Sequence, residues 1–183
     1  KRRKNAEEYF YKNKKGLPMN NLKYVGTRNK DITATASQAI LKGICDDGGL
    51  FIPESIPKID KSLKELSKLD YKGLAYEILK LYLTDFTEEE LKYCINGAYD
   101  SKFDTPAIAP VVKKGDVSVL ELFHGRTIAF KDMALSILPY LMKTAAKKNG
   151  IDKEIVILTA TSGDTGKAAL EGFAGVDGIR IIV

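Results

Sequence analysis

The feature of this sequence that most constrains its fold is a pair of β-branched runs, residues 154–158 and 178–183, separated by a helical pattern at 166–174. Two strands joined through one helix run parallel in the same sheet, because a tight hairpin joins only antiparallel strands. The second run ends on three apolar residues, and a parallel strand of that kind is normally covered on both faces. We therefore predict an α/β fold, and we expect this chain to be part of a longer protein.

The first half of the chain is predicted to form a small α+β domain over residues 19–105. Thr87 followed by Glu90 is a capping box, which indicates a helix start rather than a cluster of catalytic carboxylates. Asp46 and Asp47 precede two glycines, and we favour turn chemistry over a metal site for this pair, so no metal is expected. The predicted elements are strands at 22–26 and 50–52 and helices at 35–44, 71–83 and 87–99.

The second half, residues 106–183, is predicted to be the first part of a parallel-sheet domain. Prolines punctuate its start, and the sequence 113–116 between two apolar runs, 111–112 and 117–123, is typical of a hairpin turn. A helical pattern then runs from 130 to 149. Pro139 falls inside it and should kink or split the helix.

Residues 1–18 carry the excess positive charge of the chain. They contain seven basic and two acidic residues, which accounts for the whole net charge of +5. We interpret them as a tag or an upstream segment outside the functional argument. The alternative is a basic arm that binds nucleic acid, but no basic patch continues into the neutral remainder, so we expect no nucleic-acid partner.

The remaining composition is typical of a globular protein in a reducing compartment. No apolar run is long enough to span a bilayer, and no signal peptide is visible, so we expect no membrane association. The two cysteines, Cys45 and Cys94, have no metal-ligand partners nearby in the sequence. Core thiols in a cytoplasmic protein are the interpretation we favour.

The first stretch that suggests chemistry surrounds Lys131. A strand-like run leads into a loop with the only histidine, His124, and Lys131 follows at the start of the helical pattern. The first turn of a helix favours negative charge, and apolar neighbours (Ile128, Phe130 and Met133) would limit hydration of the amine. Both effects disfavour the ammonium form, and a neutral, fixed amine is what Schiff-base chemistry needs. The alternative is an ordinary surface lysine.

A second stretch, residues 159–168, places small and hydroxyl residues between a strand and a helix. This layout directs backbone N–H groups at an anion. A nucleotide P-loop would need glycine at position 161 and serine or threonine after Lys167, but Thr161 and Ala168 stand there. A plain turn needs fewer small residues. An anion-binding loop is therefore the favoured interpretation.

Taken together, the two stretches resemble those of the threonine synthase family. That family carries His-Gly-Pro-Thr…Ala-Phe-Lys-Asp, here residues 124–132, followed by Thr-Ser-Gly-Asp-Thr-Gly, here 161–166. A third block, residues 43–54, resembles the family's Ala-Asp-Asp-Gly-Gly-Leu-Tyr-Val-Pro. The resemblance extends from Met19 to Val183. One departure is Arg126, which stands where the family usually has proline.

The resemblance implies a pyridoxal 5′-phosphate enzyme of fold type II. Its expected reaction converts O-phospho-L-homoserine and water into L-threonine and phosphate. It further implies that Lys131 is the catalytic lysine that attaches the cofactor, and that the loop for the cofactor phosphate lies beyond Val183. This piece alone is therefore expected to bind the cofactor poorly and to be inactive.

The resemblance assigns the remaining roles by position. Ser162, Gly163 and Thr165 would hold the substrate carboxylate through backbone N–H groups, and Asp164 stands near the expected place of the cofactor ring. His124, Arg126 and Thr127 are candidates for the substrate phosphate, with a structural role for the histidine equally open. Asp132 is expected to favour the start of the helix.

Two other functions remain open at this point. One is a related lyase of the same cofactor class, such as a threonine dehydratase. The other is a non-catalytic, threonine-synthase-like fragment that acts as a binding module. Substrate assays would distinguish the three functions. Threonine and phosphate would indicate threonine synthase, 2-oxobutyrate would indicate the related lyase, and no product would indicate the non-catalytic fragment.

Overall fold

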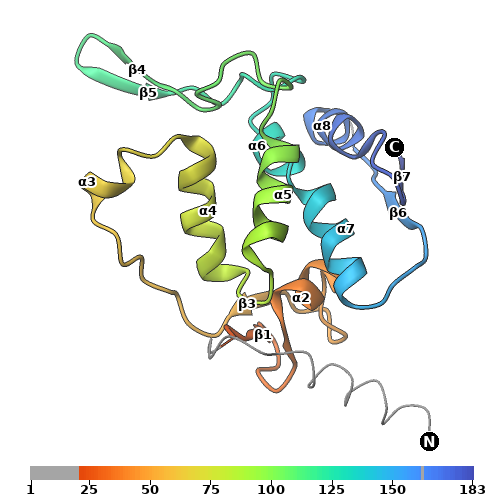
Figure 1. Ribbon diagram of the computed structural model, residues 1–183. Coiled ribbons are helices and arrows are strands. Elements are labelled where there is room, and N and C mark those ends of the chain that lie inside the picture. Colours follow the sequence, from red (N-terminus) through yellow and green to blue (C-terminus); the bar gives the residue numbers. More distant parts are fainter. Residues whose placement is uncertain (1–20, 162) are drawn as a thin grey trace, which may run out of the picture.

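A computed structural model describes residues 21–161 and 163–183, and Figure 1 shows their arrangement. The predicted tail 1–18 lies outside these residues. A small antiparallel sheet with strand order β2-β1-β3 lies at one end of the molecule, and helices rise from it. The elements of this first part are β1 (Tyr24–Gly26), β2 (Thr33–Ala34), α2 (Ala36–Lys42), β3 (Phe51–Pro53), α3 (Leu63–Leu66), α4 (Tyr71–Tyr82) and α5 (Glu88–Ala98).

Local sequence signals set these boundaries. Both Thr35 and Thr87 form the capping box at the start of their helices, α2 and α5, and the second of these confirms the prediction. The strands at 22–26 and 50–52 and the long helices are found within a few residues of their predicted places. The short elements β2 and α3 were not predicted, because two and four residues carry too little periodicity.

The second part begins with the predicted hairpin, β4 (Val111–Lys114) and β5 (Val117–Leu120), which pair antiparallel. The hairpin projects from the helical body, and seven of its eight strand residues are exposed (Figure 1). β5 ends at Leu120, three residues before the predicted end of the strand. The chain then turns back to the body through residues 121–131.

The predicted helix 130–149 is split, as the proline indicated. It forms α6 (Asp132–Leu135) and α7 (Leu138–Lys148), with Pro139 in the first turn of α7, where its missing N–H costs nothing. Gly150 follows with a φ of 66°. The predicted parallel unit is also confirmed: β6 (Ile155–Leu158) and β7 (Ile179–Ile182) pair parallel around α8 (Asp164–Phe173).

One apolar cluster joins the helices. It contains thirteen buried residues, from Ala36 to Ala145, and α7 packs against both α2 and α5. Leu91 and Cys94 of α5 are among its most buried side chains. Burial of a large apolar side chain stabilises a fold by about 1.5–3 kcal/mol, so this cluster is the main source of stability. A smaller cluster holds α8 against β7 through Phe173 and Ile179.

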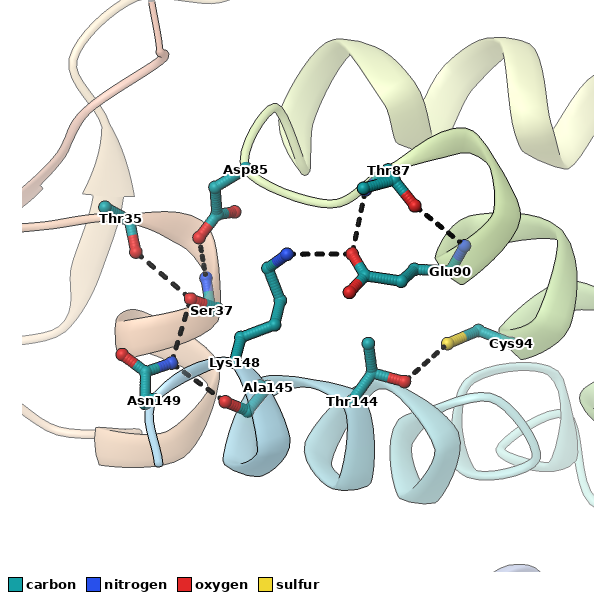
Figure 2. Close-up of polar contacts among 10 residues, drawn as sticks. All are labelled: Thr35, Ser37, Asp85, Thr87, Glu90, Cys94, Thr144, Ala145, Lys148 and Asn149. Carbon is teal, nitrogen blue, oxygen red and sulfur yellow. Dashed lines mark hydrogen bonds and ion pairs between the residues drawn. The ribbon is translucent and has the colours of Figure 1, made fainter. Parts of the chain in front are cut away.

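Polar contacts along α7 fix how it sits on its neighbours (Figure 2). The Lys148 ammonium donates to the Glu90 carboxylate at 2.8 Å, and the Asn149 amide donates to the Ser37 hydroxyl at 3.0 Å. The Asp85 carboxylate accepts from the backbone N–H of Ser37 at 3.1 Å. The first two contacts tie the C-terminal end of α7 to α5 and α2, and the third ties α2 to the segment between α4 and α5.

Within the described residues, no helix is both long enough and apolar enough to cross a membrane.

Candidate functional site

Lys131 occupies the N-cap of α6, at the end of a tight turn. Its backbone carbonyl accepts from the N–H groups of Ala134 and Leu135, so its main chain is already helical (φ −65°, ψ −20°). The side chain is partly buried, and its amine lies 4.5 Å from the centre of the Phe130 ring. A cation above an aromatic face is a favourable contact. The described structure gives this amine no carboxylate partner within 4.0 Å.

The apolar surroundings predicted for Lys131 are only partly present. Ile128 is 69 % exposed and Phe130 is 61 % exposed, so two of the three expected neighbours face solvent, while Met133 packs against the main core. The prediction that these three residues together would exclude water from the amine was wrong. Hydrophobic type alone does not place a side chain inside when a short turn directs it outward.

The turn before Lys131 contains a strained residue. Ile128 has a φ of 67°, a conformation that is unfavourable for a β-branched side chain. Its N–H donates to the carbonyl of Gly125 at 3.0 Å, and the N–H of Asp132 donates to Ala129 at 3.0 Å. Such strain costs about 1–3 kcal/mol and persists only where the surroundings enforce it. The backbone that leads to Lys131 is therefore held in one shape.

A buried contact between Thr127 and Asp132 enforces that shape. The Thr127 hydroxyl donates to Asp132 Oδ1 at 2.5 Å, and its backbone N–H donates to Oδ2 at 2.8 Å. Both side chains are buried. A Cβ at Gly125 would collide with the Asp132 side chain, so only glycine lets the loop approach this closely. We call this arrangement the Thr127–Asp132 latch.

His124 lies at the other end of the loop, between two carboxylates. Nε2 is 2.9 Å from Glu121 Oε2, and Nδ1 is 2.5 Å from Asp104 Oδ1. The hydrogen bonds that the ring makes to the carboxylates of Glu121 and Asp104 raise the pKa of His124 above its usual value. The side chain is mostly buried, and the Phe123 ring lies beside it at 4.6 Å between ring centres, tilted by 31°.

Arg126 connects this loop to α8. Its guanidinium donates to the Glu171 carboxylate at 2.6 Å, and both side chains are partly exposed. Nearby, a Cβ on Gly172 would collide with the carbonyl of Leu135, so glycine allows α8 to pack closely on α6. The loop, α6 and the C-terminal half of α8 are thereby brought together (Figure 1).

The anion-binding loop of the sequence analysis lies at the other end of α8. Gly163 is the N-cap residue and has no side-chain cap, and Asp164 and Thr165 form the exposed first turn. The first N–H groups of a helix have no intrahelical partner, so they are available to an anion. This end lies about 10 Å along the helix axis from Glu171. Ser162 lies outside the described residues.

Sequence reasoning missed the carboxylates that hold the site. Asp104, Glu121 and Glu171 contact residues of the loop, yet two of them are 20 and 45 residues away from their partners. Only Glu121, three residues before His124, could have been found from local spacing. Among the described residues, no group of three or more histidine, cysteine, aspartate or glutamate side chains could hold a metal ion.

Comparison with known proteins gives a consistent result. Residues 23–99 match the family model described as threonine synthase N terminus. The threonine synthase of Saccharomyces cerevisiae is 37 % identical over 166 residues, which cover 82 % of this chain and 32 % of that protein. The chain thus spans about a third of the length of the curated relatives it matches.

Solved structures show the same likeness. The crystal structure of threonine synthase from yeast superposes with a TM-score of 0.81 at 35 % identity, covering 90 % of this chain and 35 % of that one. The threonine synthase from Brucella melitensis, solved with PLP bound, gives a TM-score of 0.77 at 34 % identity, covering 87 % of this chain and 34 % of that one. The mixed α/β fold predicted from the sequence is confirmed.

Proposed function

Because this chain belongs to the threonine synthase family and matches the N-terminal third of its members, we propose that it is the lysine-bearing part of a threonine synthase. The proposed reaction converts O-phospho-L-homoserine and water into L-threonine and phosphate, with pyridoxal 5′-phosphate as cofactor. The observation that carries the proposal is the setting of Lys131: an amine at the end of a latched, strained turn, with no carboxylate partner in the described structure.

The residues present fit that cofactor class. Covalent attachment needs a lysine whose amine is not neutralised by an ion pair, and the Lys131 amine contacts only the face of Phe130 among the polar and aromatic interactions of the described residues. The N-terminus of α8 has no side-chain cap and offers N–H groups to an anionic group, and a Cβ at Gly163 would meet no described residue within 4 Å apart from its chain neighbours. When bound, pyridoxal 5′-phosphate supplies the electron sink for reactions at the substrate carbons.

The chain's own residues would contribute binding and proton transfer. Lys131 would attach the cofactor and, once the substrate has replaced it, would carry protons between the substrate carbons. The latch would keep its amine within reach of those carbons, because Thr127 and Asp132 fix the backbone one to four residues away. Since its hydroxyl already donates to Asp132, Thr127 would meet a substrate phosphate only by giving up that bond.

The N-terminal turn of α8 would bind the substrate carboxylate. Backbone N–H groups from Ser162 to Thr165 are the proposed donors, favoured by the positive end of the helix dipole. Asp164 is proposed to lie near the cofactor ring. An ionised carboxylate cannot donate a hydrogen bond, so Asp164 would act there in its protonated state, through a water or with another partner.

We also propose a cytoplasmic location, which is supported by two free, buried thiols, Cys45 and Cys94. We further propose that the chain divides after residue 105 into the two predicted domains, 19–105 and 106–183. The buried cluster of the helical body includes residues from both sides of that position, so we propose that the two domains share one core.

The test is a product assay on the full-length enzyme with O-phospho-L-homoserine. Lys131→Ala should lower turnover by at least about 10²–10⁴-fold, the usual contribution of a positioned proton carrier. Lys147→Ala, an exposed lysine on α7, is the matched control and should retain activity. Unchanged turnover in Lys131→Ala would overturn the assignment. Release of 2-oxobutyrate in place of threonine and phosphate would identify a related lyase instead.

A further inference from the structure

His124 closes the base of the projecting hairpin. Its two carboxylate partners come from opposite sides of the hairpin: Asp104 precedes β4 and Glu121 follows β5. The backbone repeats the connection, because the N–H of Asp104 donates to the carbonyl of His124 at 3.0 Å. The N–H of Glu121 donates to the carbonyl of Pro110 at 2.9 Å. The ring therefore lies where the hairpin, the end of the α5 segment and the loop to Lys131 meet.

The geometry also fixes the charge of the ring. A neutral imidazole has one N–H donor and one acceptor nitrogen, whereas a carboxylate can only accept. Both ring nitrogens of His124 face carboxylate oxygens, at 2.5 and 2.9 Å. In the neutral form, one of these contacts would place two lone pairs against each other. With both carboxylates ionised, the observed pair of contacts needs the imidazolium, which donates from both nitrogens.

We propose that His124 is a positioning residue: an imidazolium held between Asp104 and Glu121 that joins the hairpin base to the loop leading to Lys131, and releases that connection when it loses its proton. This role differs from contact with the substrate phosphate, because both ring donors are already used. The effect of this role on the position of Lys131 rests on the proposed function, whereas the titration of the His124 ring does not.

The direction of the pH dependence follows from linkage. The charged groups that face the ring in the described structure are Glu121, from the segment after β5, and Asp104, from the segment after α5. We call His124 with its two carboxylate partners the His124 clamp. Since the carboxylates raise the pKa of His124 in the folded protein, the clamp is complete below the unfolded pKa of about 6.5 and is lost as the pH rises through the higher folded value. The protein should therefore hold this region more firmly in mildly acidic solution than in alkaline solution.

The two carboxylates should contribute unequally. Glu121 is 20 % exposed and Asp104 is 71 % exposed, so solvent screens the second more strongly. Glu121→Gln should therefore lower the pKa of His124 more than Asp104→Asn does. Asp116→Asn is the matched control, because it removes the same charge from the exposed turn of the same hairpin.

The experiment is an NMR titration of the ring ¹⁵N and ¹H signals of His124 in the full-length protein, assigned by their loss in His124→Asn. We expect the ring to be charged near neutral pH, with both N–H groups hydrogen-bonded and a pKa above about 6.5. This pKa should be lower in both carboxylate variants and unchanged in the control. A ring that titrates at or below about 6.5, or a pKa that Glu121→Gln leaves unchanged, would overturn the proposal.

A second measurement tests the positioning role without using activity. Hydrogen exchange of the Asp104 amide, which donates to His124, should be faster in Glu121→Gln than in Asp116→Asn at the same pH. Equal exchange would show that the clamp does not hold the hairpin base. If Glu121→Gln does not fold, the exposed Asp104→Asn serves in both measurements, with exchange at residue 104 compared as a protection factor because the substitution changes the intrinsic rate of that amide. Since neither needs cofactor or turnover, failure here is distinguishable from failure of the Lys131 assignment.

Discussion

The helical body and the loop that carries Lys131 are built in different ways. The body, formed by α2, α4, α5 and α7, buries one continuous apolar cluster and adds polar contacts at its seams (Figure 2). The segment 121–131 buries few apolar side chains, and its shape depends on three polar contacts: the His124 clamp, the Thr127–Asp132 latch and the Arg126–Glu171 ion pair. The first construction provides stability, and the second provides a defined position for one amine.

Strained backbone is found in both regions. Ile108, with a φ of 59°, belongs to the buried cluster of the body, whereas Ile128, with a φ of 67°, lies between the latch residues. Its cost of about 1–3 kcal/mol is offset by apolar burial in the helical body, which is larger. A loop held by directional contacts can keep a fixed geometry without surrounding the amine with apolar side chains.

The largest effect on stability is expected in the body. Leu91→Ala should lower the free energy of unfolding by about 2–5 kcal/mol, because Leu91 is 1 % exposed and its removal leaves a cavity. Leu74→Ala on α4, where the side chain is 38 % exposed, should cost clearly less. Denaturant titration of both variants measures the contrast. Equal losses would mean that the cluster is not the main source of stability.

The next effect concerns the latch. Thr127→Val keeps the side-chain shape but removes the hydroxyl donor, which leaves one oxygen of the buried Asp132 carboxylate without this donor. The expected loss is about 1–3 kcal/mol of unfolding free energy. In the full-length enzyme, turnover should also fall, because the backbone before Lys131 is held less firmly. Thr33→Val in the exposed strand β2 is the control. Normal turnover in Thr127→Val would mean that the latch does not determine the position of Lys131.

The smallest effect is expected at the surface ion pair. Arg126→Ala should lower the unfolding free energy by about 0.2–1 kcal/mol, because both partners are partly exposed and screened. A double-mutant cycle with Glu171→Gln, measured at low and high salt, isolates the pair. A coupling energy above this range, unaffected by salt, would mean that the loop depends on Arg126 more than its exposure indicates.

Local signals in the sequence predicted much of the fold. The capping box at Thr87, the helix split at Pro139 and the parallel strands around α8 each follow from residues close together in the chain. Lys131 at the start of its helix was also found in this way. These features depend on backbone preference and periodicity, which a single sequence records.

The contacts that hold the candidate site could not be predicted in the same way. Asp104 meets His124, and Glu171 meets Arg126, only because α5, the hairpin and α8 pack as they do. The exposure of Ile128 and Phe130 depends on which way the turn before Lys131 faces, and hydrophobicity does not record that. Tertiary packing decides these features.

The most direct test of the account is to identify the lysine that takes the cofactor. Full-length enzyme is incubated with pyridoxal 5′-phosphate, reduced with borohydride and digested, and the labelled peptide is sequenced. The account predicts that the label lies on Lys131 and is lost in Lys131→Ala but not in Lys147→Ala. A label on any other lysine, or undiminished labelling of Lys131→Ala, would contradict it.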